Sequence, residues 1–321
     1  MEAADNDDIS DSGYAESLSS NDNNNDANTS YVTSIASSIR RGVIEYGRVY
    51  AAHGQHFYGL PVDDEEQERN ELQHSKFLLL YDGLFHLAPM WTAQPQKILD
   101  LGTGRGSWAM DMADQYASAK VLGLDIAPVQ HMWVPGNCEF EILDIESEWL
   151  LGDGTWDFIH GRELLYCIRD WPRLIAQAYA HLRPGAYLEV SGTLPTLGCD
   201  DGSWEREGSA YQELSEVFFD IGDALGTDGW APEKWRAQLE EAGFEDVQER
   251  VFKMPTKPWA KDQRLKELGL LERVNFMEYL NSGMERGYVG LLGRDPAQLQ
   301  VLLAQARKER QDGSVHTYVH L

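Results

Sequence analysis

The sequence contains few cysteines and no long apolar run. Its three cysteines, Cys138, Cys167 and Cys199, have no C-x-x-C or Cys/His spacing, so they indicate neither a disulfide framework nor a zinc site. No apolar stretch approaches the roughly 18 residues that a membrane-spanning helix requires. We therefore expect no metal, no disulfide scaffold and no membrane span.

Basic residues are also scarce. The chain has 27 Lys and Arg against 53 Asp and Glu, a net charge of −26. Nucleic-acid binding depends on neutralising phosphates, so this charge argues against a nucleic-acid partner, and it argues equally against an anionic membrane. The N-terminus shows no basic start followed by an apolar run, which predicts no secretory signal. We expect a cytoplasmic protein.

The N-terminal third divides into two parts. Residues 1–30 hold eight acidic side chains and no Lys or Arg, and their Asn- and Ser-rich composition predicts a disordered tail. Residues 31–92 are expected to form a helical cap. One helix is predicted from apolar residues that recur at three and four positions, namely Val32, Ile35, Ile39, Val43 and Tyr46. A second is predicted over 65–87, after Pro61 and Asp63.

The most informative stretch is ILDLGTGRGSW, residues 98–108. It predicts an apolar strand carrying Asp100, a turn containing Gly102 and Gly104, and then a helix. Glycines allow a ligand to approach the backbone closely, and the start of a helix presents free N–H groups. The D-x-G-x-G-x-G spacing differs from the G-x-G-x-x-G of dinucleotide sites. It suits a ligand with an amino-acid end, such as S-adenosylmethionine.

Two further predicted strands end in carboxylates. Asp125 closes the strand 120–125, about 20 residues after the turn, where Rossmann-like folds place a ribose-binding acid. Asp144 closes the next strand, and its neighbour Ile145 could cover an adenine ring while the carboxylate accepts from the amino group. A single Asp at a strand end is often a turn residue. Three such strands in series favour a nucleoside-containing cofactor.

Alternating strands and helices predict a parallel, doubly wound α/β sheet. The expected strands are 97–101, 120–125, 138–143, 156–160 and 186–191, with helices at 107–117, 128–132 and 170–182. Helices at 209–225, 232–242, 261–283 and 295–310, and strands at 244–252 and from about 314, are expected to follow. The predicted divisions are a cofactor-binding core at 93–254, a helical insertion at 255–312 over the substrate, and a final core strand at 313–321.

Specific motifs covering about half of the chain resemble the LaeA-like fungal class I methyltransferases, which use S-adenosylmethionine. They include Tyr46-Gly47-Arg48, Leu60-Pro61-Val62-Asp63, Leu72-Gln73-His74, Asp100-Leu101-Gly102-Thr103-Gly104, Gly123-Leu124-Asp125, Trp133-Val134-Pro135, Trp156–His160 and Asp170-Trp171-Pro172. Val62 and Arg105 depart from the usual family residues. The resemblance implies a Rossmann-like methyltransferase fold with a mostly parallel seven-stranded sheet, flanked by helices and ending in an antiparallel strand.

The pattern and the resemblance together define a predicted site. The expected cofactor-binding residues are Tyr46, Asp100, Gly102, Thr103, Gly104, Asp125, Ile126, Asp144, Ile145, His160 and Arg162. His160 could accept a proton from an acceptor hydroxyl, or it could be a structural strand-end residue. Tyr166 is a second candidate for that role. Arg162 could hold the cofactor carboxylate bidentately, or it could pair with Glu163 or with an acid of the N-terminal helices.

Further residues are candidates for the substrate side of the site. Glu66, Arg69 and His74 lie near one face of the predicted helix. They could form a solvated face with an internal Glu66–Arg69 pair. The resemblance instead implies a segment that packs over the cofactor with Tyr46 and Tyr58. Trp230 and Trp259 could line an aromatic substrate pocket, or they could be core residues.

Three functions remain open from the sequence. The leading one is S-adenosylmethionine-dependent methyl transfer to O, N or C of a small molecule, in fungal secondary metabolism. The second is a LaeA-like regulator that acts through protein partners, with a nuclear location. The third is a non-methylating step such as a cyclisation. Methyl transfer from an activated sulfonium mainly requires positioning and exclusion of water, so these motifs identify the cofactor better than the acceptor.

Overall fold

Five parallel strands form the sheet that positions the candidate site. A computed structural model describes residues 42–54, 58–90, 94–205 and 207–321, with the side chains of 281–282 left aside. The predicted tail at 1–30 and the helix start at 31–41 lie outside the described residues. The strands are β3 (Lys97–Leu101), β4 (Lys120–Asp125), β5 (Cys138–Ile142), β6 (Trp156–Arg162) and β7 (Leu182–Ser191). Their order is β5-β4-β3-β6-β7.

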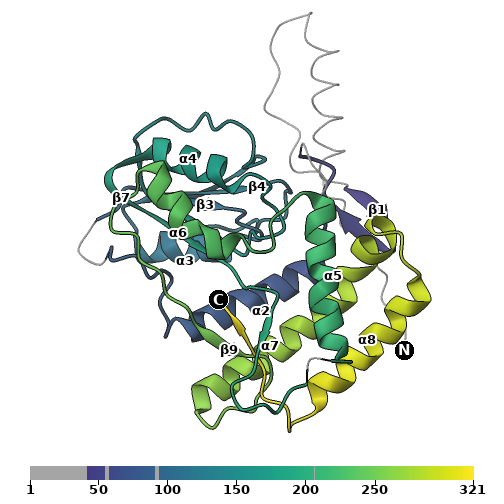
Figure 1. Ribbon diagram of the computed structural model, residues 1–321. Coiled ribbons are helices and arrows are strands. Elements are labelled where there is room, and N and C mark those ends of the chain that lie inside the picture. Colours follow the sequence, from purple (N-terminus) through teal and green to yellow (C-terminus); the bar gives the residue numbers. More distant parts are fainter. Residues whose placement is uncertain (1–41, 55–57, 91–93, 206) are drawn as a thin grey trace, which may run out of the picture. The chain divides into compact units, whose positions relative to one another are not determined.

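Apolar side chains on both faces explain why helices cover this sheet on both sides. Ile98 and Phe158 pack against one face with residues of α3 (Ser107–Gln115). The neighbouring Leu99 and Ile159 point to the opposite face, where they pack with residues of α4 (Trp171–His181) and α6 (Ala231–Ala242). Figure 1 shows α4 and α6 together and α3 across the sheet from α4. The Rossmann-like fold class predicted from the sequence is thereby confirmed.

The strand order reverses between β3 and β6. From β3, the strands β4 and β5 are added toward one edge of the sheet. The chain then crosses over, and β6 and β7 are added on the other side of β3. Ligands of such sheets bind in the crevice outside the carboxyl ends of the strands at this reversal. The register sets Asp100 directly beside His160. Two residues that are 60 positions apart therefore meet at the expected ligand-binding edge.

A group of helices forms a second hydrophobic core. It contains residues of α2 (Asp64–Leu80), α5 (Ala210–Leu225), α7 (Gln263–Ser282) and α8 (Pro296–Gln311), together with the π-helical turn Arg286–Leu291. Side-chain caps begin these helices. Asp63, Ser209, Asp262 and Asp295 each accept a hydrogen bond from a backbone N–H of the first turn. Figure 1 shows α2 beside α7, away from the sheet's helices α4 and α6.

The helix predicted through Val43 and Tyr46 is wrong in its described part. Residues 43–50 form a hairpin of β1 (Val43–Glu45) and β2 (Arg48–Tyr50). Tyr46 and Gly47 have φ values of 50° and 74°, and this pair of positive angles defines a two-residue turn that matches strand twist. The turn residues therefore override the helical spacing of the apolar side chains.

Within the described residues, the main sheet has five strands and not the predicted seven. The last strand, β10 (Tyr318–His320), pairs antiparallel with β8 (Leu197–Gly198) and β9 (Lys253–Pro255) in a separate three-stranded sheet. Residues 244–252 are described and contain no strand, and most of their side chains are exposed. The antiparallel direction of the last strand is as expected, but its partners are short segments outside the main sheet.

The short helix predicted at 128–132 is absent from this described segment. Its polar groups bind the glycine turn instead. Gln130 Nε2 donates to the carbonyl oxygen of Gly104 at 2.9 Å, and the His131 N–H donates to that of Arg105 at 3.3 Å. Contacts with a distant loop therefore replace hydrogen bonds within a helix.

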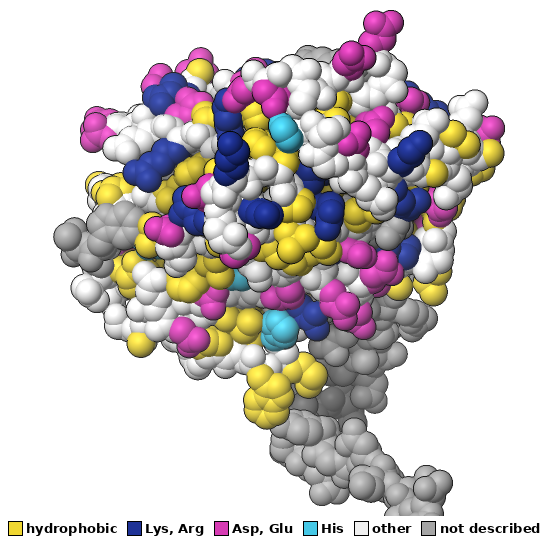
Figure 2. Space-filling model, turned by 90° about the horizontal axis from the view of Figure 1, so that it is seen from below, with side chains coloured by type: hydrophobic (Ala, Val, Ile, Leu, Met, Phe, Trp, Pro, Cys, Tyr) yellow, Lys and Arg dark blue, Asp and Glu magenta, His cyan; other side chains and the backbone are white. Residues whose placement is uncertain are grey.

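The surface carries both signs of charge. On the face seen in Figure 2, Lys and Arg side chains lie among Asp and Glu side chains, with hydrophobic side chains between them. Among the described residues, no helix has both the length and the apolar character needed to cross a membrane.

A buried ion pair joins α2 to α7. Lys76 Nζ donates to Glu272 Oε2 at 2.9 Å, and the two side chains are 3% and 6% exposed. Removing Lys76 takes away the shortest cationic contact of the buried Glu272 carboxylate and leaves it with Arg310 Nη2, 3.7 Å away. Breaking a buried pair in this way destabilises the protein more than an exposed pair can stabilise it.

We therefore expect Lys76→Ala to lower the free energy of unfolding by about 3–5 kcal/mol, measured by urea denaturation. The matched control is Arg264→Ala, because Arg264 pairs with Asp82 at 3.0 Å in an exposed position. That change should cost at most about 1 kcal/mol. Equal losses in the two variants would contradict the assignment of the Lys76–Glu272 pair as a structural link.

Candidate active site

A cavity of about 190 Å³ lies at the carboxyl ends of β3, β4 and β6. It gathers ten of the eleven predicted cofactor residues, namely Asp100, Gly102, Thr103, Gly104, Asp125, Ile126, Asp144, Ile145, His160 and Arg162. Three predicted substrate-side residues, Tyr58, Arg69 and His74, also line it. The cavity therefore joins segments from β3, β4, β6 and α2 that are far apart in the sequence.

The turn after β3 requires glycine at two positions for different contacts. Gly102 has a φ of 63°, and a Cβ there would lie 2.4 Å from Leu164 Cδ2. Gly106 has a φ of 93°, and a Cβ there would lie 2.2 Å from Phe140 Cζ. Side chains would therefore strain the backbone and overlap neighbouring residues. The resulting tight turn leaves the backbone open toward the cavity.

Asp125, at the end of β4, fixes this turn. Its Oδ2 accepts from the N–H of Gly104 at 2.8 Å, and its Oδ1 accepts from the N–H of Ala127 at 3.0 Å. Burial raises the pKa of Asp125 to about 6, although these backbone N–H groups oppose the shift. Each carboxylate oxygen can accept more than one hydrogen bond. The residue therefore suits a ligand that brings further hydroxyl donors, as a ribose does.

Asp100 and His160 form a buried pair beneath the turn. Asp100 Oδ1 accepts from His160 Nδ1 at 2.8 Å, and Oδ2 accepts from the Thr103 hydroxyl at 2.7 Å. The imidazole stacks on Trp108, with ring centroids 3.7 Å apart and planes 8° from parallel. Because Nδ1 carries the donated proton, Nε2 of the neutral ring is the proton-accepting nitrogen. The ring is therefore fixed in both orientation and tautomer.

Arg162 is the first member of a chain of polar contacts. Its Nη2 donates to His74 Nδ1 at 2.9 Å, and His74 Nε2 lies 2.8 Å from Asp111 Oδ2. The guanidinium also lies over the ring of Phe77, 4.6 Å from its centroid. Burial lowers the pKa of Arg162, while the negative charge of Asp100 opposes this shift. Arg162 is thus a partly desolvated cation in the cavity wall.

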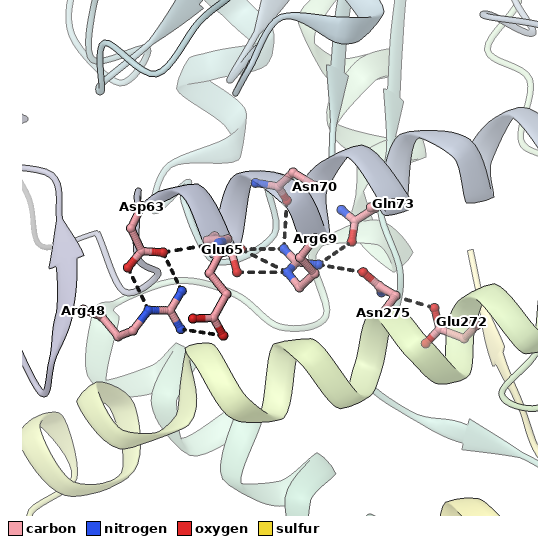
Figure 3. Close-up of polar contacts among 9 residues, drawn as sticks. Arg48, Asp63, Glu65, Arg69, Asn70, Gln73, Glu272 and Asn275 are labelled. Carbon is pink, nitrogen blue, oxygen red and sulfur yellow. Dashed lines mark hydrogen bonds and ion pairs between the residues drawn. The ribbon is translucent and has the colours of Figure 1, made fainter. Parts of the chain in front are cut away.

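The guanidinium of Arg69 is bound by polar side chains of α2 and α7, as Figure 3 shows. Its Nε and Nη2 donate to Glu66 at 2.6–3.1 Å, and Nη2 also donates to Asn70 at 2.8 Å. Nη1 donates to Gln73 at 2.9 Å and, on α7, to Asn275 at 2.8 Å. All five N–H donors of the guanidinium are therefore used within the protein. Arg69 joins α2 to α7, and Glu66 lies outside the cavity lining.

Besides Glu66, four predicted residues lie outside the cavity lining. Tyr46 is exposed in the β1–β2 turn. The Tyr166 hydroxyl oxygen is buried with no hydrogen-bond partner among the described residues, and burial raises its pKa well above the usual value. Trp230 stacks on Phe219 with ring centroids 4.7 Å apart, and Trp259 Nε1 donates to the Thr317 carbonyl oxygen at 2.8 Å. The two tryptophans therefore make separate packing contacts.

The sequence analysis missed how α2 and α3 meet at the site. The Ser107 hydroxyl donates to Glu71 Oε1 at 2.5 Å, in parallel with the His74–Asp111 contact. Glu71 and His74 are three residues apart on one helix, and Ser107 and Asp111 are four apart on the other. Such spacings place each pair on one face of its helix. Complementary pairs on two helices are the signal that could have predicted this contact.

Comparison with known proteins agrees with this geometry. Residues 72–249 match the family described as a methyltransferase domain. The chain is 36% identical to methyltransferase pytC of Aspergillus terreus, over 88% of this chain and 87% of that one. It is 31% identical to the secondary metabolism regulator laeA of Aspergillus flavus (85% and 74%), and 28% identical to the protein-methionine methyltransferase laeA of Emericella nidulans (85% and 73%).

The chain belongs to the methyltransferase domain family. Within it, the chain is one of the LaeA-like fungal methyltransferases of secondary metabolism. This membership confirms the predicted enzyme class, an S-adenosylmethionine-dependent methyltransferase. The glycine turn and the carboxylates of Asp100, Asp125 and Asp144, which were predicted to bind this cofactor, line one cavity.

The raised pKa of Asp125 gives a testable pH dependence. Below about pH 6 the free protein carries a protonated Asp125, which loses acceptor capacity for ribose hydroxyls. Affinity for S-adenosylhomocysteine, measured by calorimetry, should therefore fall as the pH decreases through 6, by up to about tenfold per pH unit. Asp125→Asn should bind about 10–100-fold more weakly at pH 7.5 and lose this pH dependence.

The control for this measurement is Asp114→Asn, because Asp114 is exposed on α3. It should keep both the affinity and the pH profile of the unchanged protein. A pH profile that is the same with and without the Asp125 carboxylate would contradict the predicted role of Asp125 in binding the ribose.

Proposed function

We propose that this protein transfers a methyl group from S-adenosylmethionine to a small-molecule acceptor in fungal secondary metabolism. The observation that supports this is the composition of the one cavity described above. Beside the polar residues suited to the cofactor, its wall has aromatic and aliphatic side chains from before α2 and after β6. These are Tyr58, Leu60, Val62 and Leu164. An apolar wall next to the cofactor residues suits a small, largely apolar acceptor.

Each part of the cofactor has a candidate partner. Asp125 would accept from the ribose hydroxyls, and Asp144 would accept from the adenine amino group while Ile145 covers the ring. Arg162 would hold the carboxylate of the amino-acid end. When bound, S-adenosylmethionine supplies a methyl group that is already activated by its positively charged sulfur. The protein's own task is therefore to orient the acceptor and to keep water out.

His160 is the residue that we assign to the acceptor's proton. Its Nδ1 is bound to Asp100, so Nε2 is the accepting nitrogen, and the stacked Trp108 holds the ring in place. A base of this kind is required only when the acceptor atom carries a proton at the working pH. The buried Asp100 would then stabilise the imidazolium that forms.

A second candidate function follows from the names of two relatives. A secondary metabolism regulator and a protein-methionine methyltransferase each share about 30% identity with this chain. They favour a regulatory protein that acts on or through protein partners, and the predicted nuclear location would accompany that role. The cofactor residues would be the same in both cases, so the acceptor distinguishes the two functions.

The acceptor is identified by transfer of isotopically labelled methyl groups. The purified full chain is incubated with methyl-labelled S-adenosylmethionine and either the small-molecule extract or the protein fraction of a producing fungus. We expect label in the small-molecule fraction, and at least tenfold less with Asp125→Asn. Asp114→Asn should label as well as the unchanged protein. Label confined to the protein fraction would overturn the proposal in favour of the regulator.

The role of His160 is tested with the acceptor found in this way. His160→Asn places an amide N–H donor near the position of Nδ1, beside Asp100, but removes the basic nitrogen, so kcat should fall by about 10²–10⁴-fold. The affinity for S-adenosylhomocysteine should change no more than a few-fold, because the polar contact with Asp100 is retained. A kcat that stays within about twofold would show that His160 is a structural residue.

A further inference from the structure

Arg162 differs from Arg69 and Arg169, two of the three other arginines that line the cavity; the third, Arg105, lies in the glycine turn. Arg69 uses all its donors, and Arg169 pairs with Glu146 at 2.9 Å. Among the described residues, the guanidinium of Arg162 has one hydrogen-bond acceptor, His74 Nδ1, and no ion pair with an Asp or Glu oxygen. A partly desolvated cation without a carboxylate partner is unfavourable. The cavity therefore presents a positive group that suits an anionic group of a ligand.

His74 reaches Arg162 as an acceptor, which requires one particular tautomer. An arginine can only donate, so His74 Nδ1 must be unprotonated in the contact of 2.9 Å. The proton of the neutral ring then lies on Nε2, which donates to Asp111 Oδ2 at 2.8 Å. Asp111 thus selects the tautomer that accepts from Arg162. This arrangement resembles the way in which a carboxylate orients a ligating histidine.

The guanidinium is held at two points on different sides. His74 binds it through Nη2, and the ring of Phe77 lies against it with the centroid 4.6 Å away. Both residues belong to α2 and are three positions apart, so they share a face of that helix. The helix itself is tied independently to α7 by the Lys76–Glu272 pair and to α3 by the Ser107–Glu71 contact. Helix docking therefore does not depend on His74.

We propose that His74, held by Asp111, is a positioning residue that orients Arg162 toward the carboxylate of the cofactor's amino-acid end. The inference rests on the proposed function, because it assumes that S-adenosylmethionine binds in this cavity. It also divides the cavity residues into two groups that bind different parts of the cofactor. The nucleoside depends on Asp125 and Asp144, and the amino-acid end depends on the chain from Asp111 through His74 to Arg162.

The test compares two ligands on the full chain by calorimetry. S-Adenosylhomocysteine has both the nucleoside and the amino-acid end, whereas 5′-methylthioadenosine has the nucleoside and no carboxylate. His74→Ala should weaken S-adenosylhomocysteine about tenfold and leave 5′-methylthioadenosine within twofold. Arg162→Ala should produce the same selectivity with a larger loss. His74→Gln should restore most of the affinity, because its amide can accept from Arg162 and donate to Asp111.

Asp114→Asn is the matched control for Asp111→Asn, since both lie on α3 and Asp114 is exposed without a contact to His74. The Asp111 change should weaken S-adenosylhomocysteine selectively, and the control should not. Equal weakening of both ligands by His74→Ala, or no weakening, would overturn the positioning role. Selective loss in Arg105→Ala but not in His74→Ala would overturn it by assigning the carboxylate to the glycine turn. If the unchanged protein binds neither ligand, the proposed function itself fails.

Discussion

The candidate site depends on the need to satisfy one buried carboxylate, that of Asp100. With 3% of its surface exposed, it cannot obtain hydrogen bonds from bulk water. It accepts instead from Thr103 in the glycine turn and from His160 on the neighbouring strand. These two bonds fix where the turn leaves β3 and how the imidazole faces the cavity. A polar network of this kind orders a site only when every member is satisfied.

The remaining parts of the site follow from this arrangement. The glycine turn continues to Gly104, whose N–H binds Asp125 and so connects β3 to β4. On the opposite side, α2 forms a wall that is tied to α7 through Arg69 and to α3 through Glu71 and His74. The sheet thus supplies groups suited to the nucleoside, and α2 contributes the residues that orient Arg162. Catalysis by positioning requires such rigid support from two directions.

Local patterns predicted the parts of this structure that depend on local sequence. The strand–turn–helix at 98–108 and the acid-ended strand at 120–125 are determined within short segments, and both are confirmed. Other features depend on residues far apart in the chain. These are the pairing of β10, the hydrogen bond from Arg69 to Asn275, and the contact of His74 with Asp111. Periodicity cannot report such contacts. At Tyr46, turn geometry outweighed a helical pattern.

A crystal structure of the protein with S-adenosylhomocysteine tests the central claim most directly. The account predicts the nucleoside in the cavity at the ends of β3 and β4, with both ribose hydroxyls within hydrogen-bond distance of Asp125 and the carboxylate at Arg162. A ligand bound elsewhere, or one whose ribose is turned away from Asp125, would contradict it.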